Sequence, residues 1–258
     1  MKVVLFAGGL GTRLSEETEI RPKPMVEIGG KPMLWHIMKI YSHYGFSDFI
    51  VCLGYKGYFI KEYFMNYFLH NSDITIDLAN NQMQVHGTNA EPIRVTLVET
   101  GLTTKTAGRL QQVQKYIGDE DFMLTYGDGV CDVDLASLLA FHRQHNKIAT
   151  VTSVALESRF GGMDLDDSDI VTAFKEKSKD ESKWINGGFF VLKPAVFNYL
   201  NGDMSNMMWE DEPLEKLARD GQLIAFKHKG FWKCMDALRD KIELEEMWNT
   251  NNAKWKVW

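Results

Sequence analysis

The stretch VVLFAGGLGTR, residues 3–13, decides which fold to expect for this chain. Apolar residues that run straight into glycines are typical of a buried strand that ends at a ligand-binding loop. Glycines let backbone N–H groups approach an anion without a Cβ in the way, so a phosphate is the expected guest. Arg13 adds a cation beside these amides, and Lys23, held between two prolines, adds a second. Together they indicate a polyphosphate.

The glycine spacing excludes two common phosphate-binding loops. GGLGTR lacks the third glycine of G-x-G-x-x-G and the lysine of G-x-x-x-x-G-K-[ST], so neither a dinucleotide-binding oxidoreductase nor a P-loop NTPase is supported. On the glycines alone, a tight turn that binds nothing stays open.

Strand-like and helix-like segments alternate along the chain, which predicts an α/β fold. We expect a Rossmann-like, mixed, mostly parallel central sheet flanked by helices. Three strand-like stretches within 73–99 predict an insertion of antiparallel strands. No segment resembles a linker, so a single domain over 1–258 is expected, ending in a C-terminal helix and tail over 237–258. The other expected strands cover 2–7, 48–55, 121–126 and 148–156, and the other expected helices cover 32–45, 57–70, 107–118, 134–146 and 212–221.

Composition limits the classes of function. The 258 residues are 45% hydrophobic with a net charge of −6, and no apolar run approaches the roughly 18 residues of a membrane span. Neither a membrane nor a nucleic acid is therefore an expected partner. The N-terminus lacks the pattern of a secretory signal, and the 3 cysteines lack close spacing. Buried thiols in a cytoplasmic protein are the expectation.

Three further patterns carry expectations about packing. The aromatic residues within 57–70 recur at helical spacing, which predicts a core stripe. His142 and His145 lack nearby Cys or His residues that would complete a zinc site, so both are expected to face solvent. The strands of 73–99 and the aromatic tail AKWKVW are candidate contacts in a homo-oligomer, although the tail fits equally well closed over its own chain.

Two aspartates have ordinary structural interpretations on their own. Asp128 stands between two glycines, as in a turn after a strand, and Asp236 precedes the last expected helix, where it fits an N-cap. Asp128 would also project from the carboxyl edge of the sheet, which is where ligands bind in open α/β folds.

The chain resembles the sugar-nucleotide pyrophosphorylases, a family of nucleotidyltransferases. The resemblance covers nearly the whole chain and is carried by LFAGGLGTRL (5–14), PKPM (22–25), YGDGV (126–130), FKEKSK (174–179) and INGGFFVL (185–192). The subfamily that it resembles most, the glucose-1-phosphate cytidylyltransferases, implies transfer of a cytidylyl group from CTP to glucose 1-phosphate. The products would be CDP-glucose, for deoxysugar and lipopolysaccharide O-antigen synthesis, and pyrophosphate, with Mg²⁺ as cofactor.

The resemblance also implies roles for individual residues. Arg13 and Lys23 would be catalytic, Asp128 and Asp236 would hold the metal, and Glu176, Lys177, Asn186 and Gly187 would bind the sugar phosphate. The nucleotide would be bound by Phe6, Ala7, Gly8, Gly9, Leu10, Gly11, Thr12, Arg13, Lys23, Thr104, Thr106, Gly108, Arg109 and Gly127.

The chain departs from the family pattern at two motif positions. Ser178 stands where proline is usual after Glu176-Lys177, and Ala107 replaces a glycine before Gly108-Arg109. Two other functions therefore stay open: the same chemistry with another nucleotide or phosphorylated acceptor, and a non-catalytic sugar-nucleotide-binding homologue. The presence of the loop arginine, both lysines and both aspartates favours an enzyme.

Overall fold

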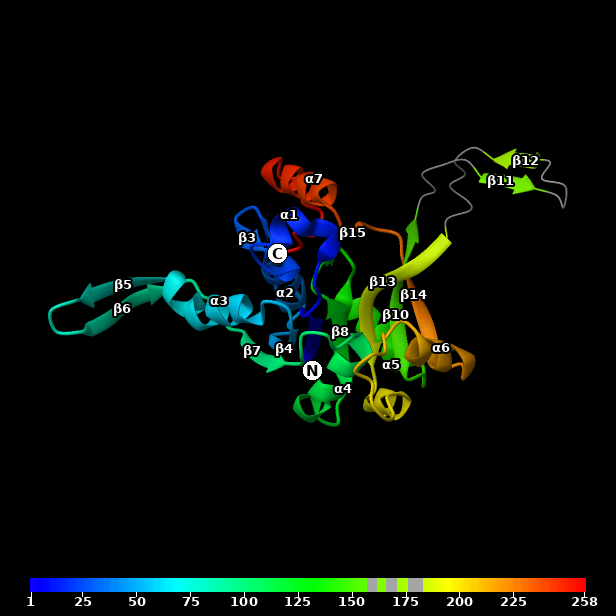
Figure 1. Ribbon diagram of the computed structural model, residues 1–258, viewed down its shortest axis with the longest axis horizontal. Helices are drawn as coiled ribbons and strands as arrows, with labels where there is room; N and C mark the ends of the chain where they lie inside the picture. The colour runs from blue at the N-terminus through cyan, green and yellow to red at the C-terminus, as the bar shows by residue number, and fades with distance from the viewer. Residues whose placement is uncertain (157–161, 166–170, 176–182) are drawn as a thin grey trace.

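A seven-stranded sheet forms the centre of the computed structural model, which describes all residues except 157–161, 166–170 and 176–182 (Figure 1). Only β13 runs antiparallel to its neighbours, so the expected mixed, mostly parallel sheet is confirmed. In spatial order, the strands are β14 (Leu223–His228), β10 (Ala149–Leu156), β13 (Lys183–Leu192), β8 (Phe122–Tyr126), β1 (Val3–Phe6), β4 (Asp48–Leu53) and β7 (Arg94–Glu99).

Helices cover both faces of this sheet. In β1, Val3 and Leu5 belong to one hydrophobic core and Val4 and Phe6 to another, because successive side chains of a strand point to opposite faces. The first core contains residues of α2 (Met33–His43), α3 (Gly57–His70), α5 (Leu135–Gln144) and α7 (Leu238–Asn249). The second contains residues of α4 (Thr106–Ile117), η4 (Pro194–Tyr199) and α6 (Glu212–Arg219).

The remaining elements are short. They are η1 (Thr12–Leu14), α1 (Ser15–Thr18), η2 (Lys23–Met25), β2 (Glu27–Ile28), β3 (Lys31–Pro32), β5 (Ser72–Asp77), β6 (Gln82–Thr88), β9 (Gly129–Cys131), β11 (Gly162–Leu165), β12 (Val171–Lys175) and β15 (Trp232–Cys234). No helix in the described part of the chain is long and apolar enough to span a membrane.

The expected insertion over 73–99 is smaller than predicted. β5 and β6 form an antiparallel hairpin that projects from the end of α3, away from the body of the molecule (Figure 1). β7 instead pairs in parallel with β4 and forms an edge of the central sheet. The pattern of IRVTLVE predicts a strand, but it does not predict whether that strand runs parallel or antiparallel to its neighbour. The direction depends on the strand with which it pairs.

Two packing expectations were wrong. The aromatic residues of α3 do not form one core stripe, because Tyr58 is 57% exposed and Phe68 is 47% exposed, while Tyr67 is buried. His142 does not face solvent: it is fully buried, and its Nδ1 lies 2.8 Å from the Thr150 hydroxyl. Because this face of α5 packs against the sheet, the polar side chain of His142 needs a buried hydrogen-bonding partner, and Thr150 provides it.

The C-terminal tail packs against its own chain. Trp255 is fully buried and its ring stacks on that of Trp248. Trp258 contacts Trp35 edge to face, with the ring centroids 5.7 Å apart. Of the two alternatives for AKWKVW, closure over the body of the same chain is the one observed.

Candidate functional site

The candidate site lies where β1 and β8 end, at the carboxyl edge of the sheet. The glycine loop follows β1, and the turn that carries Asp128 follows β8. A second small sheet completes the site: β15 pairs with β9, and the Met235 N–H donates to the Asp128 carbonyl at 2.8 Å. These contacts place Asp236, the residue after Met235, beside Asp128.

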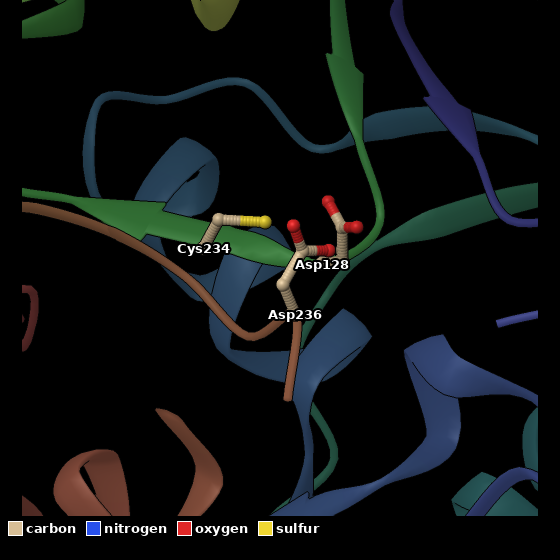
Figure 2. Close-up of side chains that lie close together, drawn as sticks. All are labelled: Asp128, Cys234 and Asp236. Atoms are coloured by element: carbon tan, nitrogen blue, oxygen red, sulfur yellow. The ribbon is translucent and has the colours of Figure 1, made fainter. Parts of the chain in front are cut away.

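A four-residue ion-pair cluster lies at this junction. The Lys23 Nζ lies 2.6 Å from Asp128 Oδ2 and 2.8 Å from Asp236 Oδ1, and an Arg13 guanidinium nitrogen lies 2.7 Å from Asp236 Oδ2. Two cations thus face two carboxylates, so the cluster has no net charge. Figure 2 shows the two aspartates side by side, with Cys234 next to them.

The environment of the cluster keeps it ionised. Burial lowers the pKa of Lys23, but the Asp128 and Asp236 carboxylates outweigh this, and the pKa lies above its ordinary value. Burial likewise raises the pKa of Asp236, and the opposing effect of Lys23 and Arg13 leaves it below its ordinary value. Lys23 is therefore a charged amine and Asp236 a carboxylate at neutral pH.

The donor set at this position suits a hard divalent cation. One ligand atom each of Asp128, Cys234 and Asp236 lies within 4.8 Å of the others. Burial, followed by the nearby Asp128 carboxylate, raises the pKa of the Cys234 thiol, so the sulfur stays protonated and is a poor metal ligand. The two carboxylates remain as ligands, and oxygen ligands of this kind suit Mg²⁺ better than Zn²⁺.

The cluster borders two cavities that share one wall. A cavity of about 330 Å³ lies on the side of the glycine loop, and a cavity of about 290 Å³ lies on the side of β13 and β15. Both are lined by Arg13, Tyr126, Asp128 and Asp236. Two ligands bound in the two cavities would therefore meet at the ion-pair cluster.

Most of the predicted residues line these cavities. In the first cavity they are Phe6, Ala7, Gly9, Gly11, Thr12, Arg13, Lys23, Thr106, Gly127, Asp128 and Asp236, and in the second they include Asn186 and Gly187. Glu176 and Lys177 lie outside the described residues. Gly8, Leu10, Thr104, Gly108 and Arg109 do not line either cavity.

Arg109 supports the backbone of the glycine loop from the interior of the protein. Its side chain is buried, and its guanidinium donates to the carbonyls of Gly8 at 2.9 Å and Leu53 at 2.8 Å, and to the Thr100 hydroxyl at 2.6 Å. A Cβ on Gly8 would lie only 2.1 Å from this guanidinium, which explains the need for glycine there. The predicted part of Arg109 in nucleotide binding stays a prediction, and the structure shows its guanidinium holding the backbone of the loop.

The interpretation of Asp236 as an N-cap was wrong. Ala237, not Asp236, is the N-cap of α7, and the Asp240 carboxylate accepts from the backbone N–H groups of both residues. At the start of α4, Lys105 is the N-cap, and the Thr106 hydroxyl accepts from the Trp209 N–H at 2.7 Å.

Sequence reasoning missed several residues of the two cavities. Tyr126 separates them, and its ring is fixed against Phe6 and Phe190 at centroid distances of 5.9 and 6.3 Å. Met208 lines the first cavity and Trp232 the second, where the Trp232 indole N–H donates to the Gly187 carbonyl at 2.8 Å. The spacing of these residues does not indicate a ligand. Only the position of Tyr126 at the start of the motif YGDGV offered a signal, while Met208 and Trp232 lie next to WEDE (209–212) and within GFWK (230–233), which were not singled out for ligand binding.

Comparison with known proteins identifies the family. The family model described as "Nucleotidyl transferase" matches residues 2–246. A glucose-1-phosphate cytidylyltransferase from Salmonella typhi is 54% identical to this chain, with 100% of each chain covered. The crystal structure of HddC from Yersinia pseudotuberculosis is similar with a TM-score of 0.69 and 25% identity, over 96% of this chain and 99% of that one.

A further solved structure shares the fold alone. A UDP-glucose pyrophosphorylase complexed with UDP-glucose is 18% identical, with a TM-score of 0.68 over 97% of this chain and 98% of that one. Agreement in fold at this low identity, together with the match over residues 2–246 and the full-length identity above, leads to one assignment. The chain belongs to the nucleotidyl transferase family, among the sugar-nucleotide pyrophosphorylases that resemble glucose-1-phosphate cytidylyltransferases.

Proposed function

We propose that this protein transfers the cytidylyl group of CTP to glucose 1-phosphate. The observation that carries the proposal is the ion-pair cluster of Arg13, Lys23, Asp128 and Asp236, in which all residues except Lys23 line both cavities. The choice of CTP and glucose 1-phosphate rests on the 54% identity to the Salmonella typhi glucose-1-phosphate cytidylyltransferase over the full chain.

The proposed reaction is a single displacement. An oxygen of the glucose 1-phosphate phosphate group attacks the α-phosphorus of CTP, and a new P–O bond forms. The bond from the α-phosphorus to the oxygen that bridges to the β-phosphorus breaks, and pyrophosphate leaves with that electron pair. No proton transfer is required, which agrees with a site built from fixed charges around Lys23.

Positive charge is the central requirement of this reaction. Two like unit charges about 4 Å apart repel by about 4 kcal/mol at an effective dielectric constant of about 20. We propose that the glycine loop receives the triphosphate and that Arg13 and Lys23 bind the leaving pyrophosphate. Their charges are balanced by Asp128 and Asp236 within the cluster, so the incoming triphosphate calls for a further cation.

We propose Mg²⁺ as that cation, held by Asp128 and Asp236. When bound, it would neutralise charge on the phosphate oxygens. Lys23, which contacts both carboxylates, would then be free to turn toward the phosphates. Asn186 and Gly187, at the second cavity, are proposed to bind the sugar, together with Glu176 and Lys177.

Two wider features belong to the same proposal. A nucleoside triphosphate substrate and free cysteines are consistent with a cytoplasmic enzyme. A homo-oligomer is proposed, with the β5–β6 hairpin as its contact, because Ile76, Leu78 and Met83 are more than half exposed there. Sedimentation of the full chain and of an Ile76→Lys variant would test the contact, since a hairpin-mediated oligomer should dissociate in the variant.

Product release tests the function directly. The purified chain is incubated with Mg²⁺, glucose 1-phosphate and, in separate reactions, CTP, UTP, dTTP, ATP or GTP, and pyrophosphate is measured. We expect CTP to be used best and mannose 1-phosphate to be a poor replacement for glucose 1-phosphate. Equal rates with all five nucleotides would contradict the base assignment. No pyrophosphate with any nucleotide would favour a non-catalytic binder.

A further inference from the structure

A carboxylate outside the predicted site lies behind the first cavity. The Thr106 hydroxyl donates to Glu210 Oε2 at 2.7 Å, and the Tyr126 hydroxyl donates to the other oxygen, Oε1. Thr106 and Tyr126 both line this cavity, whereas Glu210 does not. Glu210 thus contacts the cavity only through two hydroxyl groups.

Glu210 is held in place by the segment that precedes it. Residues 205–209 lie along the first turn of α4, where the Lys105 N–H donates to the Ser205 carbonyl at 2.8 Å and the Ala107 N–H to the Met207 carbonyl at 3.1 Å. Trp209 is fully buried and packs edge to face on Phe190. The residue after this anchor therefore has little freedom to move.

The ring of Tyr126 is equally constrained. A Cβ on Gly188, which has a φ of +81°, would lie 2.6 Å from this ring, so the backbone of β13 packs directly on it. The Tyr126 hydroxyl donates its proton to the Glu210 carboxylate.

Counting protons shows what the two hydroxyls offer to a ligand. A hydroxyl has one proton to donate and two lone pairs. Thr106 accepts from the Trp209 N–H at 2.7 Å and gives its proton to Glu210, so one lone pair remains. Tyr126 also gives its proton to Glu210 and accepts from the Asn186 amide at 3.4 Å. Tyr126 also lines the second cavity, whereas Thr106 lines only the first, so the Thr106 part of this wall accepts hydrogen bonds from a ligand in the first cavity and does not donate them.

The position of this wall relates it to the nucleobase. Arg13 and Lys23, at which the triphosphate is proposed to bind, line the first cavity together with Thr106 and Met208, and neither Thr106 nor Met208 belongs to the ion-pair cluster. A nucleotide whose phosphates contact the cations extends its base along the remaining lining. Cytosine presents a 4-amino donor on the edge where uracil presents a carbonyl acceptor.

We propose that Glu210 is a positioning residue for nucleotide choice: by taking the proton of Thr106, it makes this hydroxyl an acceptor that selects the amino group of cytosine over the carbonyl of uracil, while Tyr126 holds the other carboxylate oxygen of Glu210 in place. This inference rests on the proposed function. Glu210 itself does not touch the nucleotide.

The test compares CTP with UTP in a Glu210→Gln variant. A glutamine amide can accept from one hydroxyl but donates to the other, so at least one hydroxyl must turn its proton elsewhere. We expect the ratio of kcat/KM for CTP to that for UTP to fall about tenfold, mainly through KM, while KM for glucose 1-phosphate stays unchanged. Glu212→Gln is the matched control, because Glu212 pairs with Lys216 on the exposed side of α6 and should leave the ratio unchanged.

Two outcomes separate failure of this inference from failure of the proposed function. If the wild-type protein uses CTP and UTP equally, the proposed function is wrong and the inference falls with it. If the wild type prefers CTP and Glu210→Gln keeps the full preference, the inference alone is overturned. Should Glu210→Gln not fold, as judged by its melting temperature, Thr106→Val replaces it. This variant removes the acceptor and should lower the same ratio, and an unchanged ratio would again overturn the inference.

Discussion

The two sides of the first cavity differ in how they hold their side chains. At the charged side, Lys23 bridges Asp128 and Asp236 with N–O distances of 2.6 and 2.8 Å, and the contacts are between full charges. At the hydroxyl side, Thr106 is held by a hydrogen bond to Glu210, whose other carboxylate oxygen accepts from Tyr126. Full charges stabilise phosphate over several directions, whereas hydroxyl groups discriminate by the direction of a single proton.

This difference separates the residues that would promote the transfer reaction from the residues that would select the nucleotide. Any nucleoside triphosphate carries the same phosphates, so the charged side cannot distinguish CTP from UTP. The hydroxyl side is too weakly charged to drive phosphoryl transfer, but it can distinguish two bases. Changes at the charged side should therefore alter turnover with every nucleotide, and changes at the hydroxyl side should alter ratios between nucleotides.

The largest effect is expected for Asp128→Asn. The change removes one of the two carboxylates proposed to hold the metal while preserving the size of the side chain. We expect kcat to fall about a thousandfold, or about 4 kcal/mol of transition-state stabilisation, equally for CTP and UTP. Steady-state rates at saturating Mg²⁺ measure this fall in kcat. The control is Asp48→Asn, because Asp48 lies far from the site and pairs with Arg94. Near-normal turnover would remove Asp128 from the metal site.

Lowering the pH should decrease the free energy of unfolding before it protonates Asp236. Burial lowers the pKa of His142 to about 4, so the unfolded chain takes up a proton first as the pH falls below about 6.5. The free energy of unfolding should then decrease between about pH 6.5 and pH 4, by at most about 3 kcal/mol for this histidine. The pKa of Asp236 is lowered by Lys23 and Arg13 against the effect of burial, so that carboxylate stays ionised throughout this range.

Urea unfolding at several pH values measures this decrease. A His142→Asn variant, which retains a polar group near Thr150, should show a shallower dependence on pH than the wild type. His36, whose pKa burial lowers to about 4, and His145, whose pKa burial also lowers, would contribute to the remaining slope. An unchanged slope in the variant would show that His142 does not contribute.

The next effect is expected for Lys23→Ala. The loss of the amine leaves Asp128 and Asp236 facing each other without the cation between them, and it removes a proposed contact to the triphosphate. We expect kcat/KM for CTP to fall about a hundredfold, mainly through KM, and KM for glucose 1-phosphate to change less. Lys61→Ala, which removes a lysine of α3 that pairs with Glu99, is the control. An equal rise of both KM values would contradict the placement of Lys23 at the triphosphate.

The smallest effect is expected for Asn186→Ala. Asn186 lines the second cavity, where its Oδ1 accepts from the Gly188 N–H at 2.8 Å and its amide lies 3.4 Å from the Tyr126 hydroxyl. We expect KM for glucose 1-phosphate to rise about tenfold through the loss of one hydrogen-bonding group, with kcat/KM ratios between nucleotides nearly unchanged. Initial rates at varied glucose 1-phosphate measure this, with Asn201→Ala, at an exposed position, as control. A changed nucleotide ratio would show that the two cavities are coupled through Tyr126.

The charged side was open to sequence analysis because its residues stand in motifs with a physical reason for each residue type. Arg13 follows the glycines, Lys23 is held between prolines, and Asp128 ends a buried strand. Asp236 had a simpler explanation as a helix cap, and only the resemblance to a family gave it a role. Its true position depends on the pairing of β15 with β9, which local patterns do not predict.

The hydroxyl side could not be predicted in the same way. Glu210 is one of several acidic residues in WEDE, and nothing in the spacing distinguishes it from Glu212 on the exposed side of α6. Its part follows from the docking of residues 205–209 onto α4, a contact between distant segments. For Arg109 the sequence motif was recognised, but the contacts of the side chain were not predicted. Arg109 is buried next to Gly8, and its guanidinium donates to the Gly8 carbonyl.

The pairing of β9 with β15 also has a consequence for synthesis of the chain. Lys23 and Asp236 are separated by 213 positions, so the ion-pair cluster closes a loop that includes most of the protein. A nascent chain that has not yet emerged beyond β15 contains the glycine loop and Asp128 but lacks the second carboxylate. With Asp236 as a proposed metal ligand, we expect catalytic competence to arrive late in translation, after the strands of the central sheet, and shortened products of interrupted synthesis to have no transferase activity.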